Sequence, residues 1–227
     1  MSQWMQILLT ALIVLAALIV CVGATNVINF MDGINGITAG YSLAVLLPLF
    51  VLNNNLHFVE PSFLIVAALG ELVFCIFNFR PKGKAKCFAG DVGSIAIAFI
   101  MLFAIGRLVV QTQDVTYLIF LLVYGVDGCL TICHRILLHE NLGEAHRKHA
   151  YQLMANELKM SHVTVSVIYM ILQLAIAAGL ILIPDTALWH WGYLFVVLLL
   201  LALAYVLFKK KYYHLHEEYL NKLKMKN

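Results

Sequence analysis

Long apolar runs dominate the hydrophobic pattern of this chain of 227 residues. Runs of roughly 17 to 25 apolar residues are long enough to cross a bilayer as helices. Lipid offers the backbone no hydrogen bonds, and the runs lack the alternation of a barrel strand, so each run is expected to be helical. The pattern predicts an all-α, polytopic membrane helical bundle of about seven transmembrane helices. The predicted spans are 7–25, a weaker and shorter run at 37–52, 62–78, 92–110, 115–133, 163–183 and 189–208.

Composition places the chain in the same class. Hydrophobic residues make up 63% and charged residues only 12%, which is far from a soluble domain. The net charge of +3, without a basic stripe interleaved with aromatics, argues against nucleic-acid binding. No Lys or Arg precedes the first run, which we therefore interpret as a retained span rather than a cleaved signal. The five cysteines lie mostly in apolar surroundings and predict small core residues, not a secreted disulfide framework.

Basic residues fall on one side of the membrane if the seven spans alternate. Every Lys and Arg except Arg107 lies in residues 79–91, in residues 134–162 or after Phe208. By the positive-inside rule these segments, together with residues 26–36, are cytoplasmic. The opposite connections are short.

The chain divides into a membrane domain, residues 1–208, and a cytoplasmic amphipathic tail, residues 209–227. Apolar residues recur in the tail at near-helical spacing among Lys and Glu. This pattern fits a helix lying on the anionic leaflet, and it fits a solvated, partly frayed tail equally well.

The first polar constellation is TNVINFMDGINGITAG, residues 25–40. Asn26, Asn29 and Asp32 recur every third residue, so a helix continuing from the first span carries them on one face. Three glycines follow, and glycine permits close approach of the backbone to a ligand. A polar helix exit explains any one of these residues, but the set predicts a binding loop.

The second constellation is FNFRPKGKAKCFAGDVGSIAIAF, residues 77–99. Asp91 stands just before an apolar helix, where it is either an N-cap or a ligand of Mg²⁺, which takes one or two carboxylates plus water and substrate phosphates. Lys82, Lys84 and Lys86 either attract an anionic substrate or simply anchor the loop at the cytoplasmic surface.

The third constellation is CHRILLHENLGEAHRKHAYQ, residues 133–152. His146 and His149 flank Arg147 and Lys148, which predicts a compact cationic group able to contact phosphates or exchange protons near neutral pH. Solvated loop histidines are one alternative. Zinc is a weaker one, because no paired C-x2-C or HExxH spacing is present. Its candidate ligands are His134, His139, His146, His149, Cys129 and Cys133.

Three ionisable residues fall within predicted spans: Glu71, Arg107 and Asp127. Such residues are costly in a membrane and often functional. Internal ion pairs or polar contacts are one interpretation, and an ion pathway is the other. Gly125 and Gly128 beside Asp127 indicate small-residue helix packing.

These constellations, in this order, resemble the motifs of bacterial polyprenyl-phosphate N-acetylhexosamine-1-phosphate transferases of the glycosyltransferase family 4 type. NVINFMDGINGITAG resembles the family's N-x-x-N-F-x-D-G-x-D-G loop, and KAKCFAGDVGS resembles its A-K-x-F-x-G-D-x-G-S loop. EAHRKHAYQ resembles the histidine motif, in the H-R-x-H form of members that initiate O-antigen. The resemblance extends from about Val22 to Gln152.

The resemblance implies an activity. Polyprenyl (undecaprenyl) phosphate would attack a UDP-N-acetylhexosamine and accept N-acetylhexosamine-1-phosphate, starting a cell-surface glycan such as cell-wall peptidoglycan or the O-antigen of lipopolysaccharide. Mg²⁺, or Mn²⁺ in its place, would be the cofactor. The expected location is the bacterial inner membrane, with active loops and tail cytoplasmic, and a homodimer remains open. Phosphoryl transfer mainly requires positioning and charge neutralisation, which these residue types supply.

The resemblance also implies roles for single residues. Asp91 matches the magnesium ligand and joins Asp32, His146 and His149 in the catalytic set, while Phe88 would stack on uracil. The other residues implied in substrate binding are Asn26, Asn29, Asn35, Asn78, Lys86, Arg135 and Arg147.

Two positions depart from the family pattern. Asn35 replaces the second acid of D-G-x-D-G, and the chain has no adjacent pair of aspartates. From this comparison we expect that amino-terminal spans of the family are missing here. The alternative function is therefore a truncated, inactive paralogue, or one part of a split enzyme, that binds UDP-sugar or lipid carrier without turnover.

Overall fold

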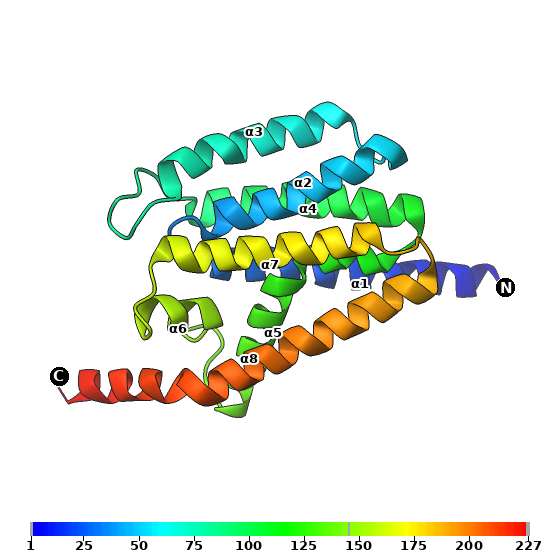
Figure 1. Cartoon of the computed structure of the whole chain (residues 1–227). Coiled ribbons are helices and arrows are strands. Elements are labelled where there is room, and N and C mark those ends of the chain that lie inside the picture. Colours follow the sequence, from blue (N-terminus) through cyan, green and yellow to red (C-terminus); the bar gives the residue numbers. More distant parts are fainter. Residues whose placement is uncertain (1, 145, 226–227) are drawn as a thin grey trace.

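The computed structural model describes residues 2–144 and 146–225. Met1, Ala145, Lys226 and Asn227 lie outside this range, so it omits the first residue of the predicted membrane domain and the end of the predicted tail. Within it the chain is all-α, as predicted, with no strand (Figure 1). The elements are α1 (Gln3–Met31), α2 (Ile37–Leu56), α3 (Pro61–Asn78), α4 (Gly90–Thr112), the 3-10 helix η1 (Val115–Leu121), α5 (Leu122–Leu137), α6 (Ala150–Asn156), α7 (His162–Leu182) and α8 (Ala187–Lys224).

Seven helical segments of the described chain are long and apolar enough to span a membrane, and each predicted run coincides with one of them. The chain is thus a multi-pass membrane protein, with η1 and α5 together making the fifth span. The weak run at 37–52 is α2, the most buried span, which packs mainly against α7 and α3. Its contacts are mainly with protein, and the buried hydroxyls of Thr38 and Ser42 both donate hydrogen bonds, so they are accommodated at little cost.

The connections between spans lie at two ends of the bundle (Figure 1). The turn after α1, the loop after α3, helix α6 and the end of α8 lie at the left in this view. The amino terminus and the three short connections lie at the right. We call the first end, which holds residues 32–36, 79–89, 138–144 and 146–149, the motif end. We call the second, which holds residues 57–60, 113–114 and 183–186, the short-loop end.

Glycine packing between α1 and α5 is confirmed at one of two predicted positions. A Cβ atom at Gly128 would lie 2.7 Å from the Val27 side chain, so this glycine allows the two helices to approach closely. A Cβ atom at Gly125 would meet nothing within 4 Å among the described residues. The prediction is therefore correct for Gly128 and wrong for Gly125.

The tail continues the last span as one helix, because α8 runs without a break past Phe208 to Lys224. His216 of this extension pairs with Glu157 at the carboxyl end of α6, with 2.7 Å between Nδ1 and Oε1. The Lys209 ammonium donates to the Lys148 carbonyl. These contacts hold the first turns of the tail against the motif end. The first turns are therefore helical and packed rather than solvated and frayed.

Candidate functional site

Asp32 and Asn29 stand where α1 ends and connect it to two other helices. Asp32 is the C-cap of α1, and the Thr38 hydroxyl of α2 donates to its carboxylate at 2.6 Å. The Ser94 hydroxyl of α4 donates to the Asn29 side-chain oxygen, also at 2.6 Å. By contrast, Asn26 is exposed and donates only to the Val22 carbonyl within its own helix.

The two acids predicted as catalytic lie close enough for their charges to interact. Burial raises the pKa of Asp32, hydrogen bonds from the Thr38 hydroxyl and the Gly90 amide oppose this, and the Asp91 carboxylate raises the pKa further. The Asn29–Ser94 hydrogen bond likewise joins the end of α1 to the start of α4, so two segments well separated in the sequence meet at the motif end.

Asp91 is not a helix cap, so the N-cap interpretation is wrong. The N-cap of α4 is Ala89, and Asp91 lies exposed within the first helical turn. Its carboxylate makes no hydrogen bond to any residue that the structure describes. A free carboxylate is thus held at the positive end of a long helix.

Asn35 and Asn78 join the two loops of the motif end. The Gly36 amide donates to Asn78 Oδ1 at 2.7 Å, and Asn78 Nδ2 donates to the Cys87 carbonyl at 2.8 Å. Asn35 Nδ2 donates to the carbonyls of Arg80 and Pro81 at 3.0 Å. Both side chains are buried. Their amides hold the loops in place, and direct contact with a substrate remains a prediction for both.

The glycines of the first loop are next to aromatic side chains rather than open space. A Cβ atom at Gly33 would overlap the Tyr151 hydroxyl, and one at Gly40 would lie 2.8 Å from Phe79. Gly36, the N-cap of α2, has φ +86°, a left-handed conformation that favours glycine. The close approach that we predicted for a ligand is thus taken, at these glycines, by side chains of the protein.

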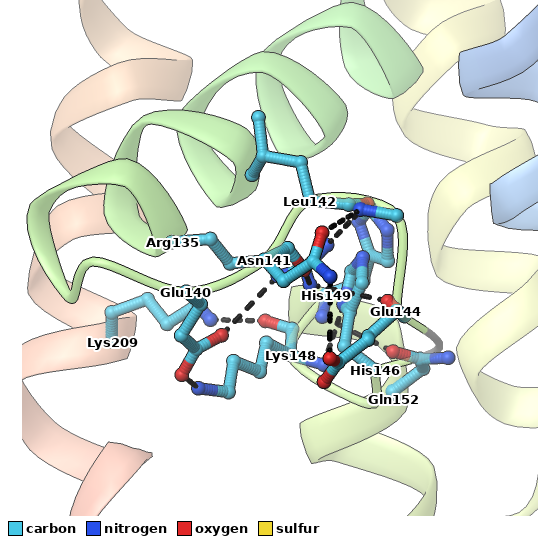
Figure 2. A network of polar contacts seen from close by, with 11 residues as sticks. Arg135, Glu140, Asn141, Leu142, Glu144, His146, Lys148, His149, Gln152 and Lys209 are labelled. Atoms are coloured by element: carbon cyan, nitrogen blue, oxygen red, sulfur yellow. Dashed lines mark hydrogen bonds and ion pairs between the residues drawn. The ribbon is translucent and has the colours of Figure 1, made fainter.

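The histidine motif lies between α5 and α6 (Figure 2). His149 is almost fully buried, and its Nδ1 lies 3.3 Å from a carboxylate oxygen of Asp127. Its ring centroid is 5.0 Å from that of His146 and 5.7 Å from that of Tyr151. His149 Nε2 is buried and has no hydrogen-bond partner among the described residues.

His146 is a neutral group, and the predicted cationic character is wrong for this residue. Burial, followed by the electrostatic influence of the neighbouring His149 ring and of Arg135 and Lys148, lowers the pKa of His146 to about 4. At neutral pH its imidazole both donates and accepts hydrogen bonds. Of the two basic residues between the histidines, Arg147 is exposed and Lys148 is buried.

Asp127 makes internal polar contacts, which confirms that interpretation for this residue. Its carboxylate accepts from the amides of Ala150 and Tyr151 at 3.0 and 3.4 Å, and from the Tyr169 hydroxyl at 2.6 Å. Arg107 also has an internal partner, the Phe58 carbonyl, at 3.2 Å.

Arg135, near the end of α5, has its partners in the loop that follows this helix. Its guanidinium is buried, lies 3.2 Å from the Glu140 carboxylate and donates to the carbonyls of residues 141, 142 and 144. Lys148 also pairs with Glu140 (Figure 2). Burial opposes ionisation of Glu140, but the hydrogen bonds from Lys148 and Arg135 outweigh it and lower the pKa of Glu140. Arg135 therefore shapes the loop, and its predicted substrate contact remains untested.

The remaining predicted ligands face open space. Lys86 and Phe88 are exposed, and Phe88 borders a cavity of about 270 Å³ that is also lined by Thr38 and Glu71. Arg147 borders two larger cavities, of about 840 and 700 Å³, and His146 borders the smaller of these.

Tyr151 links the acids to the histidines, and we did not predict it. Its hydroxyl donates to the Phe30 carbonyl at 2.9 Å, and its ring stacks beside His149. Burial raises the pKa of Tyr151, and the charges of Asp127 and Asp32 raise it further. No described hydrogen bond joins His146 to Asp32 or Asp91, so the link runs through Tyr151 and His149. The sequence signal for Tyr151 was its position inside EAHRKHAYQ, and for Ser94 its position inside GDVGS.

The carboxylates fit magnesium better than the histidines fit zinc. Within residues 2–144 and 146–225, no three or more His, Cys, Asp or Glu residues are grouped so that they could hold a metal ion. A zinc site needs such a group. Mg²⁺ needs only one or two carboxylates, with water and phosphates completing its shell. Asp91, free and beside Asp32, meets this requirement.

These features define a multi-pass membrane protein with carboxylates and histidines gathered at one end of its bundle. A family model described as "Glycosyl transferase family 4" matches residues 2–126, more than half of the chain. The chain therefore belongs to this family, which confirms the resemblance seen in its motifs.

Curated relatives carry related names. Over 195 residues the chain is 29% identical to the "Probable undecaprenyl-phosphate N-acetylglucosaminyl 1-phosphate transferase" of Bacillus subtilis, covering 82% of this chain and 52% of that protein. Over 123 residues it is 33% identical to the "Phospho-N-acetylmuramoyl-pentapeptide-transferase" of Thermotoga neapolitana, covering 54% and 38%. The chain thus spans about half, or less, of the length of these relatives.

Proposed function

We propose that this chain forms the nucleotide-sugar site of a membrane phospho-sugar transferase. The enzyme transfers N-acetylhexosamine-1-phosphate from a UDP-N-acetylhexosamine to polyprenyl (undecaprenyl) phosphate at the cytoplasmic face of the bacterial inner membrane. The single observation that carries this proposal is the Ser94–Asn29 hydrogen bond of 2.6 Å, which holds the end of α1, with Asp32, against the start of α4, with Asp91. The names of the relatives support the kind of reaction and the lipid carrier.

The reaction requires little covalent chemistry from the protein. A phosphate oxygen of the lipid attacks the sugar-proximal phosphorus of the UDP-sugar and forms a new P–O bond. The bond from that phosphorus to the bridging oxygen breaks, and UMP leaves with the electron pair. Positioning and charge neutralisation then decide the rate.

Side chains of the motif end supply both needs. Asp91 and Asp32 would hold Mg²⁺, and Mn²⁺ accepts the same oxygen ligands. When bound, the ion neutralises charge on the diphosphate and on the leaving UMP. The exposed Arg147 guanidinium suits two-point contact with a phosphate. His146 adds a neutral hydrogen bond, and the exposed ring of Phe88 offers a surface for uracil.

A transfer assay tests the proposal. The purified chain in lipid nanodiscs receives radiolabelled UDP-N-acetylglucosamine, polyprenyl phosphate and Mg²⁺, and butanol-extractable label is counted. We expect label above background that EDTA abolishes. The same assay with UDP-N-acetylgalactosamine compares two donor sugars.

The outcome also separates the two functions considered. Sugar-nucleotide binding without incorporation would reject turnover by this chain and support a binding role in a split enzyme or an inactive paralogue. Absence of both binding and incorporation would reject both functions.

A further inference from the structure

Three histidines of the described chain pair with a carboxylate, and one pair differs from the others. His190 Nδ1 lies 2.6 Å from Asp114, and its Nε2 lies 3.7 Å from Asp185, so both ring nitrogens face acids. His216 pairs with Glu157. His149 pairs with Asp127 through Nδ1 only, and its buried Nε2 has no partner in the described chain. A buried polar atom without a partner is uncommon in a native structure and calls for an explanation.

The carboxylate of Asp127 is fixed from several sides. One oxygen faces the His149 ring, the Thr131 hydroxyl and the Ala150 amide, and the other accepts from the Tyr151 amide and the Tyr169 hydroxyl. A carboxylate oxygen can only accept, so it selects the His149 form that carries a proton on Nδ1. Rotation of the carboxylate would break several bonds at once, so the direction of the ring is fixed as well.

We propose that Asp127 is a positioning residue: it holds His149 in the Nδ1-protonated form and so reserves Nε2, a hydrogen-bond acceptor in that form, for a hydroxyl group of the ligand. This inference rests on the proposed function, because the ligand meant is the sugar nucleotide, whose sugar hydroxyls can donate to Nε2. His146 borders the cavity of about 700 Å³ and His149 lies behind it, 5.0 Å between ring centroids. The ligand therefore reaches Nε2 after the half-exposed His146 side chain turns aside.

Nitrogen NMR of histidine-labelled protein tests the proposal without an activity assay. His149→Gln assigns the His149 signals. In the unaltered chain we expect a protonated Nδ1 and a bare Nε2. Asp127→Asn should replace this single form by a mixture, because an amide has one acceptor oxygen instead of two. Asp127→Glu keeps a carboxylate and should retain the Nδ1-protonated form. Asp114→Asn is the matched control and should leave the His149 signals unchanged.

Two further readouts separate failure of the inference from failure of the proposed function. UMP with Mg²⁺ should shift the Nε2 signal of the unaltered chain, and Asp127→Asn should lower the transfer rate by about 10- to 100-fold with little change in KM. A persistent Nδ1-protonated form in Asp127→Asn overturns the inference, and so does an Nε2 signal that UMP and Mg²⁺ leave in place. A mixed form in Asp127→Asn together with the UMP shift, but without transfer by the unaltered chain, supports the positioning role and rejects turnover.

Discussion

The two ends of the bundle contain the same kind of buried pair, used in different ways. At the short-loop end, Asp114 pairs with His190 and also accepts from the Thr116 amide at the start of η1. Every polar group of that small cluster has a structural task. At the motif end, Asp127 pairs with His149, but Nε2 has no described partner and the exposed Asp91 carboxylate makes no described hydrogen bond. Among the described residues, both ring nitrogens of His190 therefore face acids, whereas His149 keeps one ring nitrogen available to a ligand.

The largest expected effect comes from removing the free acid of the motif end. Asp91→Asn should lower Mg²⁺-dependent transfer by about 100-fold or more, since a bound metal contributes several kcal/mol and each 1.36 kcal/mol is tenfold. The helical circular dichroism should not change. Asp185→Asn, an exposed acid at the short-loop end, is the control and should keep full activity. Equal activity of Asp91→Asn and the unaltered chain would contradict a role for Asp91 as a Mg²⁺ ligand.

A smaller effect is expected from His146, whose role is binding. His146→Ala should weaken UDP-sugar binding by about 2- to 10-fold, the range of a neutral hydrogen bond worth 0.5–1.5 kcal/mol. Titration calorimetry measures this, and an unchanged dissociation constant would make His146 a bystander.

The same variant changes the dependence of stability on pH. The pKa of His146 is about 4 in the folded chain and near 6.5 when unfolded. The unfolded chain therefore binds the proton more readily, and stability declines as pH falls from about 6.5 towards 4. His146→Ala should reduce this decline in the melting temperature. An identical decline in both proteins would contradict the neutral imidazole.

A comparable change in stability is expected where Gly33 of the first loop contacts Tyr151 of α6. Gly33→Ala would place a methyl group on the Tyr151 hydroxyl and break its bond to Phe30, at a cost of about 1–3 kcal/mol in the free energy of unfolding. Gly70→Ala on α3 meets nothing within 4 Å of the described chain and serves as control. Thermal unfolding of both variants compares them. Equal melting temperatures would show that Tyr151 does not link the acids to the histidines.

The smallest functional effect is expected at the short-loop end. Hydrogen bonds from His190 and Thr116 outweigh burial and lower the pKa of Asp114, so its stabilising contribution is present at neutral pH and is lost as pH falls through the lowered value. Asp114→Asn should lower the melting temperature by a few degrees, about 2–4 °C per kcal/mol, with transfer unchanged. A loss of transfer at constant stability would break the contrast between the two ends.

Local patterns predicted the spans well because each depends on a run of neighbouring residues. Even the weak run at 37–52 proved to be a span, since α2 owes its lower hydropathy to burial among other helices. Orientation relative to the cytoplasm follows from charge alone and stays a prediction. The motifs also predicted that the segments of Asp32 and Asp91 belong to one site; the Asn29–Ser94 hydrogen bond joins these segments, and the catalytic roles stay predictions.

Long-range pairing was beyond the sequence. Nothing local indicates that Asp127 in a span faces His149 in a loop, because this pairing depends on how α5 and α6 dock. The glycines of the first loop were correctly singled out, but the sequence did not show that Phe79 and Tyr151 lie against them. The sequence allowed Asp91 to be either a helix N-cap or a metal ligand. In the structure α4 begins at Gly90 and its N-cap is Ala89, which excludes the N-cap interpretation.

The central claim is that acids and histidines from three segments of the motif end face one ligand. Mn²⁺ in place of Mg²⁺, added with UDP-N-acetylglucosamine, tests this directly, because the paramagnetic ion broadens the NMR signals of nearby histidines. The account predicts broadening of His146 and His149 but not of His190, and its loss in Asp91→Asn. Equal broadening of all three histidines, or unchanged broadening in Asp91→Asn, would contradict it.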